Sequence, residues 1–314
     1  MMEKDAKIYI AGHRGMFGSA ILRRLQQEGF SKFVLKTHAE LDLTRQAEVE
    51  EFFASERPDY VFLAAAKVGG ISANSKFMAE FLYENTMVEM NVIKTAWKSG
   101  AKKLCYLGSS CIYPCKAPQP LKEDCLLTGP LEPTNEGYAL AKIAGFKLCQ
   151  YLGRQYGFRS VSLMPCNLYG RNDDFNLERC HVLSALIRRF CDAVDESRKD
   201  ITLWGSGTPR REFLNVDDAA AAAILLMQTH EDPDFVNTGS GEDLQISELA
   251  GMIAKAAGFS GSILWDKSKP DGMARKLMDV SKLKSLGFKQ TVSLDEGIAQ
   301  MVAEYRARKA AGKI

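Results

Sequence analysis

The sequence predicts an α/β protein built on a doubly wound parallel sheet, with a smaller, interleaved C-terminal lobe. Three observations lead to this prediction. Short apolar runs alternate with segments of helical periodicity over residues 1–168, a glycine-rich turn follows the first run, and the alternation loosens beyond Leu168. Strands that alternate with helices are joined by right-handed crossovers, and such strands run parallel.

Each expected element has its own sequence signal. Residues 7–11 (KIYIA) are short and rich in β-forming residues, and residues 17–28 place Ile21, Leu22 and Leu25 at helical spacing before Gly29. Residues 59–66 (DYVFLAAA) are apolar along their length, as expected for a strand covered on both faces. The remaining expected strands are 33–37, 103–110 and 160–164, and the remaining helices are 48–53, 77–99, 138–151 and 181–193.

The domain boundaries follow from this pattern. We expect a nucleotide-binding domain over residues 1–168, to which residues 211–240 return, because residues 213–227 again look like part of the sheet side. Residues 169–210 and 241–314 are expected to form the second lobe, which would bind the substrate. The whole chain has 314 residues, enough for one large domain and a smaller lobe.

Composition argues against several classes of function. The net charge is only +2, so no global field favours nucleic acid or a membrane surface. No apolar run approaches the ~18 residues of a membrane helix, and the first residues lack a secretory pattern. The eight cysteines are scattered without a close CxxC pair, which argues against a metal site. We therefore expect a reduced, cytoplasmic protein with no bound metal and no nucleic-acid or membrane partner.

The glycine-rich turn predicts a dinucleotide site. Gly12, Gly15 and Gly18 lie directly between the first strand and the first helix. Glycines at this spacing allow a sharp turn, and they let backbone N–H groups and the helix N-terminus approach a pyrophosphate. A tight turn with a purely structural role is the alternative.

The end of the second expected strand favours NADP over NAD. NAD sites usually carry an acid there, whereas this segment reads Lys36, Thr37, His38. Arg14 adds a second cation inside the glycine turn. Solvated surface charges are the alternative for Lys36 and Arg14, and Asp42 is expected either to contact adenine or to cap a helix.

A tyrosine and a lysine at helical spacing predict a proton donor for the reduction of a carbonyl group. Tyr138 and Lys142 lie one helical turn apart, and a nearby ammonium is expected to lower the pKa of the phenol and make it a proton donor. Ser109 follows the fourth strand, at the edge where doubly wound sheets bind ligands. An ordinary surface Tyr–Lys pair is the alternative.

These motifs extend into a resemblance that covers nearly the whole chain. The segments that carry it are AGHRGMFGSA (11–20), LAAAKVGGI (63–71), LGSSCIYP (107–114), LEPTNEGYALAKIAG (131–145), MPCNLYG (164–170), WGSGTPRREFLNVDD (204–218) and KPDGMARKLMDVS (269–281). The chain resembles the GDP-L-fucose synthases, a family of extended short-chain dehydrogenase/reductases. The resemblance implies 3,5-epimerisation of GDP-4-keto-6-deoxy-D-mannose, reduction of its 4-keto group by NADPH, and, by analogy of fold, a homodimer.

The resemblance also implies roles for individual residues. It assigns Ser109, Tyr138 and Lys142 to reduction and Cys111 and His181 to epimerisation. Substrate binding is assigned to Arg189, Trp204, Arg211 and Asp271. The implied cofactor-binding residues are Gly12, Arg14, Gly15, Met16, Phe17, Gly18, His38, Asp42, Leu43, Ala64, Ala65, Leu107, Gly108, Lys142, Pro165, Asn167, Leu168 and His181. The chain departs from the bacterial pattern at His38, where arginine is typical, and this bears on the contact with the 2′-phosphate.

The implied epimerisation is chemically consistent. A keto group at carbon 4 acidifies the protons on carbons 3 and 5, and inversion needs a base on one face and an acid on the other. Cys111 lies two residues after Ser109, where a thiolate would serve as the base. His181 would return the proton, because imidazole exchanges protons near neutral pH. Packing roles are the alternative for both residues.

Four rival functions can be weighed from the sequence. A 4,6-dehydratase would need carboxylates where the chain has Ser110, Cys111 and Ile112, and a 4-epimerase with tightly bound NAD would favour an acid after the second strand. A simple 4-ketoreductase would need neither Cys111 nor His181. A cofactor-sensing protein without activity would be expected to lose Ser109, Tyr138 or Lys142, all of which are present.

Overall fold

Parallel strands form the centre of the first half of the molecule. The computed structural model describes residues 2–269 and 271–314, so Met1 and Pro270 of the expected domains lie outside the described residues. A six-stranded sheet has the order β2-β1-β3-β4-β5-β9, and every pairing in it is parallel. Its strands are β1 (Ile8–Ala11), β2 (Phe33–Val34), β3 (Tyr60–Leu63), β4 (Lys103–Leu107), β5 (Ser160–Pro165) and β9 (Val236–Thr238).

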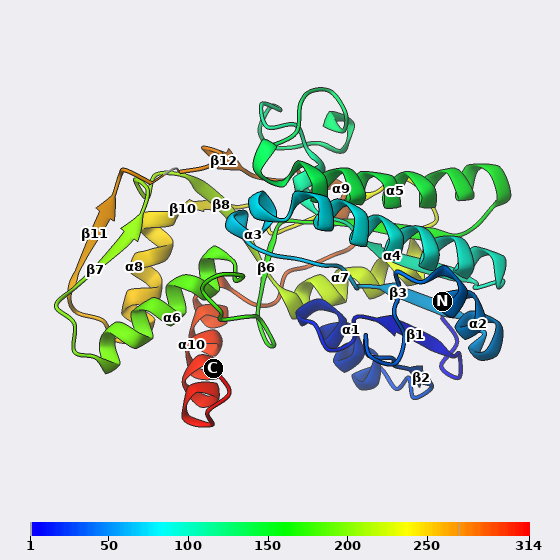
Figure 1. Cartoon of the computed structure of the whole chain (residues 1–314), viewed down its shortest axis with the longest axis horizontal. Coiled ribbons are helices and arrows are strands. Elements are labelled where there is room, and N and C mark those ends of the chain that lie inside the picture. Colours follow the sequence, from blue (N-terminus) through cyan, green and yellow to red (C-terminus); the bar gives the residue numbers. More distant parts are fainter. Residues whose placement is uncertain (1, 270) are drawn as a thin grey trace.

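Helices cover both faces of this sheet. One face carries α1 (Met16–Gln27) and α7 (Val216–Thr229), and the other carries α2 (Gln46–Glu56), α4 (Met78–Lys98) and α5 (Glu136–Tyr156) (Figure 1). The short helix α3 (Ile71–Lys76) precedes α4. Gly157 ends α5 in the left-handed region at φ 69°. The predicted doubly wound parallel sheet is confirmed.

The expected strand over 33–37 is shorter in the structure. Strand β2 contains only Phe33 and Val34, because the backbone then turns away from the sheet. The Glu40 carboxylate accepts hydrogen bonds from the Thr37 backbone N–H at 2.8 Å and from its hydroxyl at 2.6 Å, which stabilises that turn. The turn leaves residues 36–38 outside the sheet.

Short strands and helices form the second lobe, at the left of Figure 1. Its strands are β7 (Asp200–Trp204) and β11 (Ser262–Asp266), which pair with each other. Strand β8 (Arg210–Asn215) pairs with β6 (Asn167–Tyr169), β10 (Asp243–Gln245) and β12 (Arg275–Lys276). The helices of the second lobe are α6 (Val182–Asp195), α8 (Ile246–Ala257) and α10 (Leu294–Ala310), whereas α9 (Ser281–Ser285) packs against the sheet domain. Three 3₁₀ turns lie between β4 and α5, at Ser110–Ile112, Glu123–Cys125 and Pro133–Asn135.

Two buried apolar clusters correspond to the two parts of the chain. The first contains the sheet and its helices, including Leu214–Met227 of the returning segment, and the second lies among α6, α8 and α10. Met278, Val280, Leu283 and Phe288 pack in the first cluster. Residues 278–288 therefore lie against the sheet domain, which differs from the expected assignment of all of 241–314 to the second lobe.

Lys103, at the start of β4, is a buried charge that joins strand to helix. Its side chain is 1% exposed, and its ammonium donates to the backbone carbonyls of Leu226, Met227 and His230 at the end of α7. Burial lowers the pKa of Lys103, while the nearby Glu231 carboxylate opposes this shift. The lysine thus satisfies carbonyls that the helix leaves without donors.

Within the described residues, no helix is both long enough and apolar enough to span a membrane.

We expect Lys103→Met to lower the free energy of unfolding by about 2–4 kcal/mol, because buried carbonyls lose their donor. Urea denaturation followed by circular dichroism measures this loss. The matched control is Lys102→Met, since the neighbouring ammonium is half exposed and forms surface ion pairs with Glu3 at 3.3 Å and Asp59 at 3.1 Å. Its loss should cost less than about 1 kcal/mol. Equal losses in the two variants would contradict this role of Lys103.

Candidate functional site

The carboxyl ends of the parallel strands open into one large cavity. The register pairs Ala11 with Leu63, Leu63 with Tyr106, and Leu107 with Leu163, so these strands end at a common edge. The cavity at this edge has a volume of about 1090 Å³. Residues of the second lobe, Arg211, Gly272 and Lys276, close its far side. This is where a doubly wound sheet is expected to bind its ligands.

The glycine turn fits a dinucleotide. Gly12 has φ 83°, and a Cβ there would lie 2.9 Å from the Ala65 backbone nitrogen. A Cβ at Gly18 would overlap the Gly12 carbonyl oxygen. Glycine is therefore required for the backbone to fold this tightly before α1. The turn leaves Gly12, Gly15 and Met16 on the cavity wall, with the N-terminus of α1 directed at the space that a pyrophosphate would fill.

Cations gather at the ribose end of the cavity. Arg14, Lys36 and His38 all line it, and the side chain of His38 is 83% exposed. Asp42 also lines the cavity, but its Oδ1 already accepts hydrogen bonds from the Thr44 N–H at 3.0 Å and hydroxyl at 2.7 Å. The charge balance at this end suits a phosphate on the ribose.

Ser109 and Cys111 lie together where β4 ends. The Ser109 hydroxyl caps the 3₁₀ turn that follows, accepting from the Cys111 N–H at 3.3 Å, and its Oγ is 3.0 Å from the Cys111 Sγ. Tyr138, on the first turn of α5, also lines the cavity. One wall therefore presents a hydroxyl, a thiol and a phenol to a bound ligand.

Lys142 lies behind this wall rather than on it. The side chain is buried, its Nζ donates to the Leu107 carbonyl at 2.9 Å, and Nζ lies 5.6 Å from the centroid of the Tyr138 ring. The expected lowering of the Tyr138 pKa is not found. Burial raises the pKa of Tyr138 well above its ordinary value, the Cys111 and Glu89 charges raise it further, and a hydrogen bond with Ser109 lowers it.

His181 lines the same cavity from the second half of the chain. It is the residue before α6 and is exposed, with an extended backbone (φ −79°, ψ 166°). The fold thus brings His181 to the same cavity as Tyr138, although more than forty residues separate them in the sequence. His181 and Cys111 border one space, as an acid–base pair acting on one sugar would require.

The four predicted substrate-binding residues do not all line one cavity. Arg211 lines the cavity, and burial lowers the pKa of its guanidinium. In the described part of the chain no carboxylate forms an ion pair with Arg211, so its charge is available to an anion. Asp271 accepts hydrogen bonds from the Ser206 N–H at 2.7 Å and hydroxyl at 2.8 Å, which fixes the turn beside Gly272.

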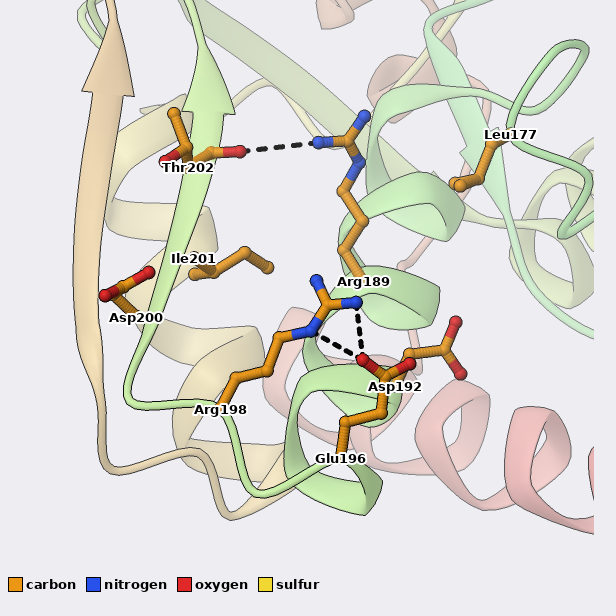
Figure 2. Close-up of a pocket in the computed structure, with 8 residues that line it drawn as sticks. All are labelled: Leu177, Arg189, Asp192, Glu196, Arg198, Asp200, Ile201 and Thr202. Atoms are coloured by element: carbon orange, nitrogen blue, oxygen red, sulfur yellow. Dashed lines mark hydrogen bonds and ion pairs between the residues drawn. The ribbon is translucent and has the colours of Figure 1, made fainter.

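Arg189 and Trp204 lie outside the large cavity. Figure 2 shows Arg189 extending from α6 over a smaller pocket of about 420 Å³, where its Nη1 donates to the Thr202 carbonyl at 3.4 Å. The Arg189 guanidinium carbon lies 5.9 Å from the centroid of the Trp204 ring, which is exposed. The two form an outer platform.

The structure brings most of the predicted residues to the large cavity. Those outside its wall are Gly18, Lys142, Arg189, Trp204 and Asp271. The cavity wall also contains polar residues that were not predicted from the sequence, among them His13, Glu132, Asn135 and Lys276. Glu132 and Asn135 lie in the EPTNEG segment just before Tyr138, so their closeness to the tyrosine is a sequence signal for the site. His13 and Lys276 carry no such signal beyond lying in segments 11–20 and 269–281, which resemble the family. Among the described residues no group of three or more possible metal ligands is found.

Comparison with known proteins places this site in a family. The family described as "NAD dependent epimerase/dehydratase family" matches residues 8–239. GDP-L-fucose synthase 1 of Arabidopsis thaliana is 55% identical over 96% of this chain and 93% of its own length. GDP-L-fucose synthase of Escherichia coli K12 is 52% identical over 93% of this chain and 94% of its own. The chain belongs to the GDP-L-fucose synthase family, within the NAD dependent epimerase/dehydratase family. The resemblance drawn from the motifs is confirmed.

A solved structure of a GDP-L-fucose synthetase supports the same placement. The NADP-bound protein from Naegleria fowleri matches with a TM-score of 0.92 and 27% identity, over all of this chain and 98% of that one. Members of this family thus share the whole fold, including the second lobe.

We expect His38→Arg to lower the KM for NADPH about two- to five-fold and leave the KM for NADH unchanged. A permanent cation beside a 2′-phosphate contributes up to about 1 kcal/mol at so exposed a position. Steady-state rates with the two cofactors measure the ratio. Arg45→Lys, at a neighbouring cation that does not line the cavity, is the control and should leave both values unchanged. A ratio unaltered by His38→Arg would place the 2′-phosphate elsewhere.

Proposed function

We propose that this protein makes GDP-L-fucose from GDP-4-keto-6-deoxy-D-mannose in two stages, inversion at carbons 3 and 5 followed by reduction at carbon 4. One observation carries the proposal. Ser109, Cys111, Tyr138 and His181 border a single cavity that the glycine turn and the cation Arg211 also line. A cavity so equipped has groups for proton exchange, carbonyl binding and anion binding within reach of one bound sugar.

The cofactor is NADPH, held along the carboxyl edge of the sheet. The Gly12–Met16 turn would hold its pyrophosphate, and Arg14, Lys36 and His38 would face its 2′-phosphate. Ala64, Ala65, Leu107, Gly108 and residues 165–168 line the part of the cavity between these ends. When bound, NADPH supplies the hydride that reduces carbon 4.

The first stage is proton exchange beside the ketone. Cys111 as thiolate removes the proton from carbon 3 or carbon 5, and the electron pair moves into the enolate oxygen. Ser109 and Tyr138 donate hydrogen bonds to that oxygen, which stabilises the charge that develops there. His181 delivers a proton to the opposite face of the same carbon, inverting it. The 3.0 Å contact of Ser109 Oγ with Cys111 Sγ places base and oxygen-binding group side by side.

The second stage needs a proton donor at the carbon 4 oxygen. Tyr138 gives its phenolic proton to that oxygen as carbon 4 becomes a hydroxyl-bearing centre, leaving a phenolate near the Lys142 ammonium. Burial keeps the pKa of Tyr138 high, so the phenol is protonated at neutral pH and ready to donate. Solvent restores the proton afterwards.

The nucleotide end of the substrate would extend toward the second lobe. Arg211 would bind the diphosphate in the cavity, since a guanidinium offers two parallel donors to phosphate oxygens. Arg189 and Trp204 would meet the remainder of the nucleotide on the outer platform. Asp271 would act through the turn that it fixes at Ser206.

The protein would act as a homodimer. Helices α4 and α5 lie side by side (Figure 1). Both expose apolar side chains, since Leu82, Tyr83, Leu140 and Tyr151 are between 39% and 65% exposed. Two such helix pairs from two copies would bury these side chains in a four-helix contact.

The eight free cysteines fit a reducing, cytoplasmic location.

The decisive test is incubation of the protein with GDP-4-keto-6-deoxy-D-mannose in deuterated water, read by NMR. Without NADPH, deuterium should enter carbons 3 and 5; with NADPH, GDP-L-fucose should form. Cys111→Ser should lower the exchange rate at least about 100-fold, since it removes the base. Cys115→Ser, which changes a cysteine outside the cavity, should not. Oxidation of NADPH without exchange would identify a simple 4-ketoreductase instead.

For the dimer, we expect Leu140→Lys combined with Tyr151→Lys to raise the dissociation constant at least about tenfold, because two buried apolar contacts become charged. Light scattering across a dilution series gives the constant. Leu264→Lys alters a 49% exposed leucine on β11, away from α4 and α5, and should leave it unchanged. A monomeric unsubstituted protein at all concentrations would contradict the proposal.

A further inference from the structure

A buried carboxylate lies directly behind the lysine of the reducing group. Glu89, on α4, is 0% exposed, and its Oε1 lies 2.9 Å from the Lys142 Nζ. The two side chains are 1% and 3% exposed, so water does not screen the pair. A carboxylate at such depth is stable only when it is neutralised or paired.

The surroundings of Glu89 hold it in this position. Tyr106 on β4 packs beside it and donates its hydroxyl to the Lys142 backbone carbonyl at 3.0 Å. On α5, Gly145 leaves the space that the carboxylate occupies, because a Cβ there would overlap Glu89 Oε2 and lie 2.6 Å from the Tyr106 hydroxyl. In the described part of the chain, Lys142 is the one cation that pairs with Glu89. The helix contact between α4 and α5 is thus built around this ion pair.

The ion pair changes what Lys142 does to Tyr138. The ammonium is shared between the Glu89 carboxylate and the Leu107 carbonyl, both at 2.9 Å, while the Tyr138 ring centroid is 5.6 Å away. The negative charge of Glu89 therefore offsets the positive charge of Lys142 as felt by the phenol. After burial and the Cys111 charge, Glu89 is the third cause that raises the pKa of Tyr138.

The groups that face Tyr138 and Glu89 come from α4, α5, β4 and the segment after β4. Tyr138 is faced by Cys111 and Ser109 from the segment after β4, by Lys142 from its own helix, and by Glu89 from α4. Glu89 is faced by Lys142 and Cys149 from α5 and by Tyr106 from β4. Lys142 is the positive charge among these groups.

We propose that Glu89 is a positioning residue for the reduction step: it fixes the Lys142 ammonium between Leu107 and Tyr138 and balances its charge, so that Tyr138 stays protonated until the carbon 4 oxygen takes its proton. Burial raises the pKa of Glu89, and the Lys142 charge beside it opposes that shift. With Glu89 ionised by this pairing, the group of Glu89, Lys142 and the Tyr138 phenol is neutral before transfer and carries one negative charge after it. Without Glu89, the group would change from one positive charge to neutral. The resting phenol would then lose its proton to solvent more readily. This inference rests on the proposed reductase function.

The test is the pH dependence of kcat for NADPH oxidation with the 4-keto sugar. Glu89→Gln keeps the shape and removes the charge, and we expect the alkaline limb of the profile to move to lower pH by roughly one unit. Glu89→Asp keeps the charge but withdraws it by one methylene. It should lower kcat several-fold while the alkaline limb stays at the position of the unsubstituted protein. An alkaline limb that does not move in Glu89→Gln overturns the proposal.

Two further variants separate charge from packing. Cys149→Ala removes a buried neighbour of Glu89 without changing the charge, and it should leave the alkaline limb in place. A shift in Cys149→Ala equal to that in Glu89→Gln would mean that packing is the cause, and would overturn the proposal. Should Glu89→Gln fail to fold, Gly145→Ala displaces the carboxylate with a methyl group and should shift the limb in the same direction; an unmoved limb would count against the proposal.

A readout without substrate keeps this test independent of the proposed function. The ultraviolet tyrosinate signal of Tyr138 is the part of a pH titration that Tyr138→Phe removes. In the Glu89→Gln background it should appear at lower pH than in the unsubstituted protein, whatever the natural substrate is. Appearance at the same pH overturns the positioning role. A shifted signal in a protein that fails to convert GDP-4-keto-6-deoxy-D-mannose would instead reject the proposed substrate.

Discussion

The parallel register of β1, β3, β4 and β5 is the constraint on which the site depends. Because these neighbouring strands are parallel and in register, the segments that follow them emerge at one edge of the sheet. The glycine turn follows β1, Ala64 and Ala65 follow β3, Ser109 follows β4, and Asn167 follows β5. No single segment contains the site. The cavity lies at this edge because one hydrogen-bonding pattern aligns four chain segments that are distant in sequence.

Buried ionisable side chains also connect distant segments of the chain. The Lys103 ammonium donates to carbonyls at the end of α7, and the Glu89 carboxylate pairs with the Lys142 ammonium. Glu212, fully buried on β8, accepts from the Gly241 N–H at 2.7 Å and the Met278 N–H at 2.9 Å, and burial raises its pKa to about 7. Each buried charge joins segments from different parts of the chain. Arg211 is the contrasting case, since its desolvated guanidinium faces the cavity, where an anionic ligand would complete it.

The two lobes are joined by more crossings than a simple division allows. The chain leaves the sheet domain after β5, returns through α7 and β9, leaves again, and returns once more at residues 278–288. Glu212 lies between two of these crossing segments, because its carboxylate accepts hydrogen bonds from the Gly241 N–H and the Met278 N–H. The cavity is therefore bordered by chain segments connected to both lobes, which favours a fixed distance between its two sides.

The sequence by itself determined the sheet, its order of alternation and the chemical groups of the site. Apolar runs and helical spacing are local signals, and the glycine turn, Ser109 and the Tyr138–Lys142 pair are specified by short spacing. Tertiary structure alone decided three things. It shortened the second strand, because Glu40 turns residues 36–38 away from the sheet. It moved residues 278–288 to the first core. It also buried Tyr138 and placed the Cys111 and Glu89 charges near it, which raises the pKa of Tyr138 where its spacing from Lys142 predicted a lowering. The pKa of a buried phenol depends on its desolvation and on every charge packed around it, and sequence spacing identifies only the charges on its own helix.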